Sequence, residues 1–182
     1  SLPSDKTIVT CGYSSDRGQQ FELTIDELER LPAELKQEFL FIFPMTYGDM
    51  VYRQEIQDKL ASSSLEYRLL TEFLTDAEVA SYRIASDMML QLREKDNFSG
   101  SMQENLYART LVLYGSWLPY KTFADSGITF WSIDSFDQLN ESMLHLRDNF
   151  EKYYPTTKGN AAIIRNLSSW ELTISSWLSM YN

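Results

Sequence analysis

The side chains that most often perform catalysis are scarce in this sequence. His145 is the only histidine and Cys11 the only cysteine. His145 follows Met143 by two positions, about 200° around a helix from the apolar stripe, so we interpret it as a solvated surface residue. Cys11 falls in a predicted strand without a basic neighbour in sequence, and we interpret it as a buried, inert thiol. We therefore predict no catalytic residue.

Motifs for metals and cofactors are missing as well. One histidine cannot supply the two Glu-x-x-His motifs of a carboxylate-bridged di-metal bundle. The sequence has no HExxH, no paired CxxC and no EF-hand loop, and its seven glycines form neither a GxGxxG nor a Walker A motif. We predict no metal site and no cofactor.

Arg109 is the charged residue with the most unusual surroundings. It is the only charge between Leu106 and Trp117 in an otherwise apolar or neutral span. A guanidinium in such a place must pair with a carboxylate, reach solvent along its stem, or meet a ligand anion. An internal ion pair is the structural explanation. The functional hypothesis is that Arg109 anchors a partner's carboxylate.

The second candidate for partner binding is the connection 119–133. It is the longest connection in the predicted chain, and exposed aromatic side chains in long loops are typical binding anchors. The alternative is that these rings close the end of a helical core. The predicted partner-binding residues here are Tyr120, Phe123, Phe130 and Trp131.

The element expected to organise the chain is a central helix over 101–118. Its second half is apolar on nearly every side, which is typical of a helix enclosed by others. A β-hairpin is predicted over 7–24, because two β-prone runs flank turn residues. The stretch 128–133 is the only other predicted strand, and it is expected to meet the hairpin.

Helical periodicity covers most of the remaining chain. Five capping-box patterns precede amphipathic runs, at Thr24/Glu27, Ser63/Glu66, Thr75/Glu78, Ser101/Glu104 and Ser135/Gln138. Together they predict a mainly α fold: a single-domain bundle of about six to eight helices around 101–118, with the hairpin packed on it. The domain is expected to span 1–182, and its size allows a core without disulfides.

Charge and hydropathy restrict the partners. The net charge is −10, from 26 acidic and 16 basic residues, and such a field repels nucleic acids and anionic membranes. It suits a basic protein partner, and homo-oligomerisation stays open. No apolar run approaches the ~20 residues of a membrane span, and no signal peptide is visible. We therefore expect a cytoplasmic protein that binds no nucleic acid directly.

These observations favour a non-enzymatic protein–protein interaction module, such as an adaptor, inhibitor or regulatory subunit. One alternative is a small-molecule-binding bundle or an enzyme with an aromatic cavity near Arg109. Tyr107, Tyr114 and Trp117 would line that cavity with it. A further alternative is a DNA-mimic inhibitor, although the acidic residues are spread fairly evenly along the chain.

Overall fold

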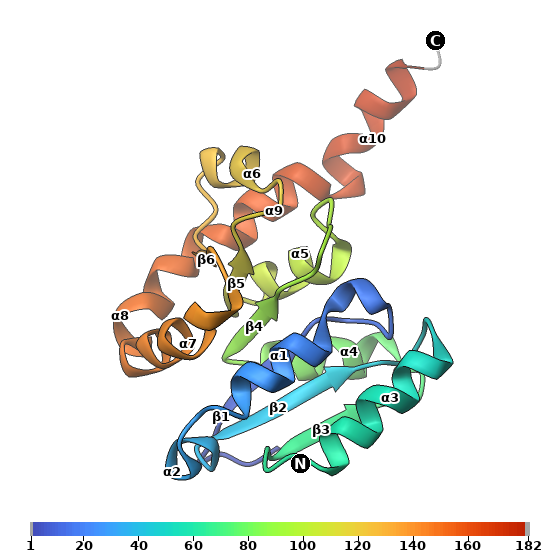
Figure 1. Cartoon of the computed structure of the whole chain (residues 1–182). Helices are drawn as coiled ribbons and strands as arrows, with labels where there is room; N and C mark the ends of the chain where they lie inside the picture. The colour runs from blue at the N-terminus through green and yellow to red at the C-terminus, as the bar shows by residue number, and fades with distance from the viewer. Residues whose placement is uncertain (1, 181–182) are drawn as a thin grey trace.

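The computed structural model describes residues 2–180 and shows an α/β architecture (Figure 1). Six strands form one sheet in the order β3-β2-β1-β4-β5-β6, and every neighbouring pair is parallel. The strands are β1 Thr7–Cys11, β2 Phe39–Pro44, β3 Tyr67–Leu70, β4 Met88–Gln91, β5 Leu111–Gly115 and β6 Trp131–Ile133.

Helices connect the strands and extend beyond the last one. They are α1 Phe21–Leu28, α2 Ala33–Lys36, α3 Met50–Ala61, α4 Asp76–Ile84, α5 Gly100–Tyr107, α6 Lys121–Asp125, α7 Leu139–Asp148, α8 Phe150–Tyr153, α9 Asn160–Ser168 and α10 Trp170–Ser179. Three 3₁₀ segments occur at Arg17–Gln19, Phe136–Gln138 and Tyr154–Gly159.

The two faces of the sheet bury alternate residues of each strand. One face carries Phe39, Phe41 and Phe43 of β2 against a core that includes residues of α1, α3 and α7. The other face carries Met89 and Val112, which pack with residues of α5 and α9. Because both faces are covered, the strands are continuous apolar runs without the polar alternation of half-exposed strands.

The mainly α prediction is wrong. The stretch 101–118, predicted as one central helix, is a helix only to Tyr107 and then becomes strand β5. Arg109 has a positive φ of 70° at the bend between the two elements, which is uncommon for a non-glycine residue. The residues of β5 are apolar on all sides because the strand is buried on both faces of a parallel sheet.

Three more buried strands were predicted as helices for the same reason. β2, β3 and β4 all lie inside segments that were predicted as helices. Short apolar runs carry no periodicity that separates the two structures. The predicted hairpin over 7–24 is also wrong, since β1 is followed by α1 and pairs with β2 and β4. The strand expected at 128–133 is present in part as β6, which pairs with β5 and not with β1.

Of the five capping boxes, the structure shows the reciprocal pair of bonds at Thr75 and Glu78, at the start of α4. Thr24 lies inside α1, and a strand follows Ser63. The cap of α5 is Ser99 and not Ser101. A spacing of three between common residue types is therefore weak evidence when nothing confirms the helix that follows.

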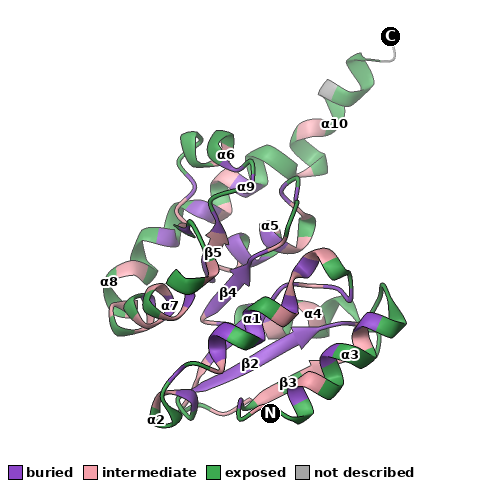
Figure 2. Cartoon of the chain, viewed as in Figure 1, coloured by how far each residue is buried: buried purple, intermediate pink, exposed green. Residues whose placement is uncertain are grey.

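Helix α10 extends away from the rest of the molecule toward the C-terminus (Figures 1 and 2). Trp170, Trp177 and Leu178 are among its exposed apolar residues. Within residues 2–180, no helix combines the length and apolar content that crossing a bilayer requires.

A core substitution tests the assignment of 39–44 as a central strand. Phe41 is fully buried in β2, in the core that includes residues of α1 and α3. We expect Phe41→Ala to lower the free energy of unfolding by about 3–5 kcal/mol, measured by urea denaturation. Ile84→Ala is the control, because Ile84 is 73% exposed and its truncation should change stability by less than about 0.5 kcal/mol. A small effect of Phe41→Ala would contradict the strand.

Candidate functional site

The order of the strands reverses direction between β1 and β4. The chain leaves β1 toward α1 on one face of the sheet and leaves β4 toward α5 on the other. In open α/β sheets a crevice forms at the carboxyl ends of the strands at such a switch point, and ligands bind there. The segments that border it are 12–18, after β1, and 92–99, after β4. We call this region the switch-point crevice.

A buried carboxylate joins the segments around this crevice. Asp96 is only 8% exposed. One of its oxygens accepts a hydrogen bond from the Tyr13 hydroxyl, at 2.9 Å, and the other accepts from the Ser99 amide, also at 2.9 Å. The Tyr120 hydroxyl donates to the second oxygen as well. Asp96 therefore ties together the loops that follow β1, β4 and β5.

Arg93 lies beside this carboxylate. Its guanidinium contacts the hydroxyl of Tyr13 and lies 5.0 Å from the centre of the same ring. It also pairs with Asp16, at 3.1 Å, and more distantly with Asp96, at 3.5 Å. The Arg93 Nε is buried without a hydrogen-bond partner among the described residues. The indole of Trp117 donates to the Arg93 carbonyl at 2.7 Å, which fixes the backbone here.

Burial sets the protonation of the phenols at the crevice. Removal from water raises the pKa of Tyr13 and, more strongly, that of Tyr120, which is fully buried. Both hydroxyls therefore keep their protons at neutral pH and donate to the carboxylate of Asp96. Gln91 donates its amide to the Tyr120 hydroxyl at 3.2 Å and completes the chain of hydrogen bonds beneath the crevice.

The N-terminus of α5 opens at the same edge of the sheet. Ser99 caps the helix by accepting from the Met102 amide. The amides of Gly100 and Ser101 have no acceptor in the part of the chain that the structure describes. A Cβ built on Gly100 would meet nothing within 4 Å, so the space next to these amides is open. Free amides and the helix dipole together favour an anion at this place.

The loops after β1 and β2 hold each other in position. Ser15 donates its amide to the Tyr47 carbonyl at 2.8 Å and accepts from the Asp49 amide at 3.0 Å. Gly48 adopts a φ of +114°, and a Cβ there would come within 2.8 Å of the Ser15 hydroxyl. Only glycine combines that backbone with so close an approach. The rim of the crevice is therefore rigid on this side.

Two further side chains extend the site along this rim. Tyr47 is half exposed, and partial burial raises the pKa of its hydroxyl. The positive charge of Arg93 lowers that pKa, and the carboxylate of Glu104 raises it. Glu104 lies on α5 and forms an ion pair with Arg83 of α4. The rim thus carries the aromatic ring of Tyr47 and the carboxylate of Glu104, which Arg83 pairs.

The sequence matches no protein-family model and no curated protein. Solved structures do match. The sucrose-phosphate synthase of Thermosynechococcus elongatus superimposes with a TM-score of 0.82 at 14% identity, over 99% of this chain and 46% of that one. Anabaena HepE, solved with UDP and glucose, gives 0.75 at 12% identity, over 97% and 49%. The C-terminal domain of the glycosyl transferase group 1 family protein LpcC from Francisella tularensis gives 0.69 at 14%, over 90% and 86%.

The chain has the fold of glycosyltransferase domains. It spans about half the length of the synthase and of HepE, and most of the LpcC domain. The prediction of a non-enzymatic interaction module, drawn from the missing catalytic motifs, the acidic charge and the aromatic content, is wrong, because the chain superimposes on glycosyltransferase domains. The two alternatives, a ligand-binding helical bundle and a DNA mimic, are wrong for the same reason. The prediction of a regulatory protein is wrong as well.

Arg109 lies at the opposite edge of the sheet, where β5 begins. Its guanidinium donates to the Tyr154 carbonyl at 3.2 Å and lies 4.3 Å from the centre of the Tyr154 ring. The hydroxyl of Thr157 in turn reaches the Arg109 carbonyl at 3.4 Å. These contacts attach the bend before β5 to the segment after α8. A role for Arg109 in partner binding stays a prediction.

The aromatic residues predicted for partner binding divide between the two faces of the sheet. Tyr120, Phe123 and Phe130 share one cluster, with ring centres of Tyr120 and Phe123 6.2 Å apart. Trp131 lies on the other face, against the core beside α7. Only Tyr120 belongs to the crevice, and it acts there through Asp96. Their role as partner anchors stays a prediction.

The main residues of the crevice were not predicted from the sequence. Asp96 and Ser99 were not among the predicted site residues, although they carry the usual chemistry of a helix start. The signal that could have found them is the abrupt change from the apolar run of β4 to Arg93 and its polar neighbours. Cys11 is buried, and burial raises the pKa of its thiol. His145 is exposed, as predicted, with its Nε2 2.8 Å from the Tyr153 hydroxyl.

Neutralising the buried carboxylate tests its structural role. Asp96→Asn keeps the shape but replaces one acceptor oxygen by a donor, which leaves at least one of its present donors unpaired. We expect a loss of about 2–3 kcal/mol in the free energy of unfolding, measured by chemical denaturation. Asp125→Asn is the control, since Asp125 forms an exposed ion pair with Lys121 and such pairs contribute at most about 1 kcal/mol. Equal effects of the two substitutions would contradict the role assigned to Asp96.

Proposed function

We propose that this chain is the domain of a glycosyltransferase that binds the nucleotide-sugar donor. The observation that carries the proposal is the switch-point crevice, where the free amides of Gly100 and Ser101 and the guanidinium of Arg93 border one edge of the sheet. A diphosphate is the ligand that this arrangement suits, because helix N-termini and arginines both bind phosphate oxygens.

The structural neighbours support this ligand class. HepE was solved with UDP and glucose, and two of the trehalose-phosphate synthases among the neighbours, both from Burkholderia species, are named as UDP-forming. The match to the LpcC C-terminal domain covers most of both chains, which supports a donor-binding unit with an acceptor-binding partner domain elsewhere. A cytoplasmic location and a basic protein partner also stay proposals.

The proposed reaction develops charge at a point that the crevice can stabilise. The bond between the anomeric carbon of the sugar and the diphosphate oxygen breaks, and the nucleoside diphosphate leaves with the electron pair. The oxygen of the acceptor hydroxyl bonds to the anomeric carbon, and its proton passes to the leaving diphosphate. Negative charge grows on the leaving diphosphate, and amides and a guanidinium oriented in advance stabilise that charge without reorganising.

Glu104 extends the proposed contacts to the ribose. It lies four residues along α5 from Gly100, a rise of about 6 Å at 1.5 Å per residue. A nucleotide whose phosphates meet the α5 amides would therefore bring its ribose diol within reach of this carboxylate. A carboxylate accepts hydrogen bonds from two neighbouring hydroxyls.

A negative charge introduced at the first residue of α5 tests the phosphate site. We expect Gly100→Asp to weaken UDP binding at least about tenfold in isothermal titration calorimetry, since a loss of 1.4 kcal/mol is a factor of ten. The substitution should not unfold the helix, because acidic residues are favoured in its first turn. Gly159→Asp is a matched control: Gly159 precedes α9, and its Cβ would also meet nothing within 4 Å. If both variants bind UDP like the parent chain, the phosphate site is not at α5.

Asp16 provides a test of Arg93. It accepts from the Arg93 guanidinium and from the Gly18 amide, so a bound phosphate must compete with it for the arginine. Asp16→Asn keeps an acceptor oxygen for Gly18 but removes the competing charge. We expect UDP affinity to rise about two- to fivefold at low salt. Asp26→Asn removes the same charge at an ion pair with Lys59 and should have no effect. Unchanged or weaker binding in Asp16→Asn would argue against a phosphate contact by Arg93.

A further inference from the structure

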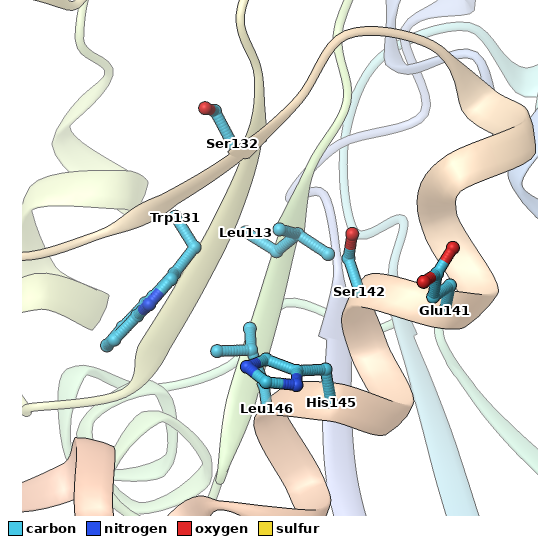
Figure 3. A pocket seen from close by; sticks show the side chains of 7 residues that line it. All are labelled: Leu113, Trp131, Ser132, Glu141, Ser142, His145 and Leu146. Atoms are coloured by element: carbon cyan, nitrogen blue, oxygen red, sulfur yellow. The ribbon is translucent and has the colours of Figure 1, made fainter.

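A separate hollow of about 240 Å³ lies between the edge strand β6 and helix α7 (Figure 3). Leu113 of β5 and Leu146 of α7 give it an apolar floor, and Trp131 of β6 forms one side. Glu141, Ser142 and His145 of α7 contribute the polar side. We call this the α7 hollow. It belongs to the α7 face of the sheet, and none of its lining residues forms the switch-point crevice.

A chain of ring contacts runs from Trp131 on one side of the hollow through Tyr153 to His145 on α7. Trp131 is half-buried, and its ring centre lies 5.3 Å from that of Tyr153. Tyr153 in turn lies 5.6 Å from the His145 ring, with its hydroxyl 2.8 Å from the imidazole Nε2. Tyr153 therefore packs against the Trp131 indole, which forms one side of the hollow.

The opposite side offers polar groups that the protein does not use. Glu141 and Ser142 make no side-chain hydrogen bond or ion pair with any other residue in 2–180. The Ser132 side chain is different: Figure 3 shows its hydroxyl pointing away from the hollow, and it hydrogen-bonds Tyr114. The free acceptors therefore come from α7, across from the indole.

This combination recognises a ligand with an apolar face and several hydroxyl groups. The C–H bonds of a sugar ring pack on the negative face of an indole, and its hydroxyls donate to a carboxylate in charge-assisted hydrogen bonds. An anionic ligand is disfavoured by Glu141 and by the net charge of −10. A small cation is disfavoured because the Lys152 ammonium already lies 5.1 Å from the centre of the Tyr153 ring.

We propose that the α7 hollow binds an uncharged pyranose unit of a glycan, separately from the nucleotide. The volume of the hollow is below the roughly 300–1,000 Å³ of sites for drug-sized ligands, which suits a single sugar ring. The inference goes beyond the proposed transfer reaction and does not rest on it. Failure of UDP to bind in the switch-point crevice would leave it unaffected.

The test titrates the chain with methyl β-D-glucopyranoside, methyl β-D-galactopyranoside and methyl α-D-mannopyranoside, followed by protein NMR. We expect at least one glycoside to bind saturably in the millimolar range, with the Trp131 indole signal shifting. Saturating UDP should not displace it. Tetramethylammonium chloride is titrated in parallel as the cationic probe.

Two variants locate the binding. Glu141→Gln removes the charged acceptor and should weaken glycoside binding about tenfold. Ser142→Leu fills the hollow and should abolish binding, and leucine is a good helix former, so α7 should stay folded. Glu151→Gln is the matched control, because Glu151 is an exposed carboxylate on α8 outside the hollow. Binding of no glycoside, binding of the ammonium ion alone, or glycoside binding that both α7 variants retain would overturn the proposal.

Discussion

The carboxylate of Asp96 is the interaction on which the edge of the sheet depends. Three parallel strands end close together there, and each is followed by a loop whose polar backbone must be positioned without strand pairing. Asp96 accepts hydrogen bonds from Tyr13, Ser99 and Tyr120, so each of the three loops supplies one donor. A buried charge is tolerated only when hydrogen bonds replace its lost hydration. The need to satisfy Asp96 therefore holds the three loops together.

That constraint also explains why the aromatic residues of this edge are tyrosines. Tyr120 is fully and Tyr13 partly buried, and both still supply a hydroxyl to the carboxylate, which phenylalanine could not do. Burial raises both pKa values, so the donors keep their protons. Arg93 adds a positive charge beside Asp96, and its exposed partner Asp16 can be replaced by a ligand more easily than the buried one. The crevice therefore has one permanent and one exchangeable carboxylate.

Features that depend on neighbouring residues could be predicted from the sequence, and features that depend on the tertiary fold could not. The Thr75 cap, the strand at 7–11, the buried Cys11 and the exposed His145 were all predictable, because each depends on neighbouring residues. Strand β5 was not, since an apolar run that is buried from all sides has the same composition in a helix and in a parallel sheet. The site was not predicted for a second reason, which is distance in sequence. Asp96, Tyr13 and Tyr120 are distant in sequence, and only the strand order brings them together.

The placement of β1 has a consequence for how the chain folds. β1 is the first strand of this sheet along the chain, yet one of its two neighbours is β4, and the Ile8 amide donates to Asp87, 79 residues further along. Contacts of such sequence separation form slowly, because a long loop must close before they contribute. Until β4 arrives, the growing chain holds β1 with one edge unpaired. An unpaired edge is a template for pairing with other chains, so the partly folded chain is open to association at β1 until β4 pairs with it.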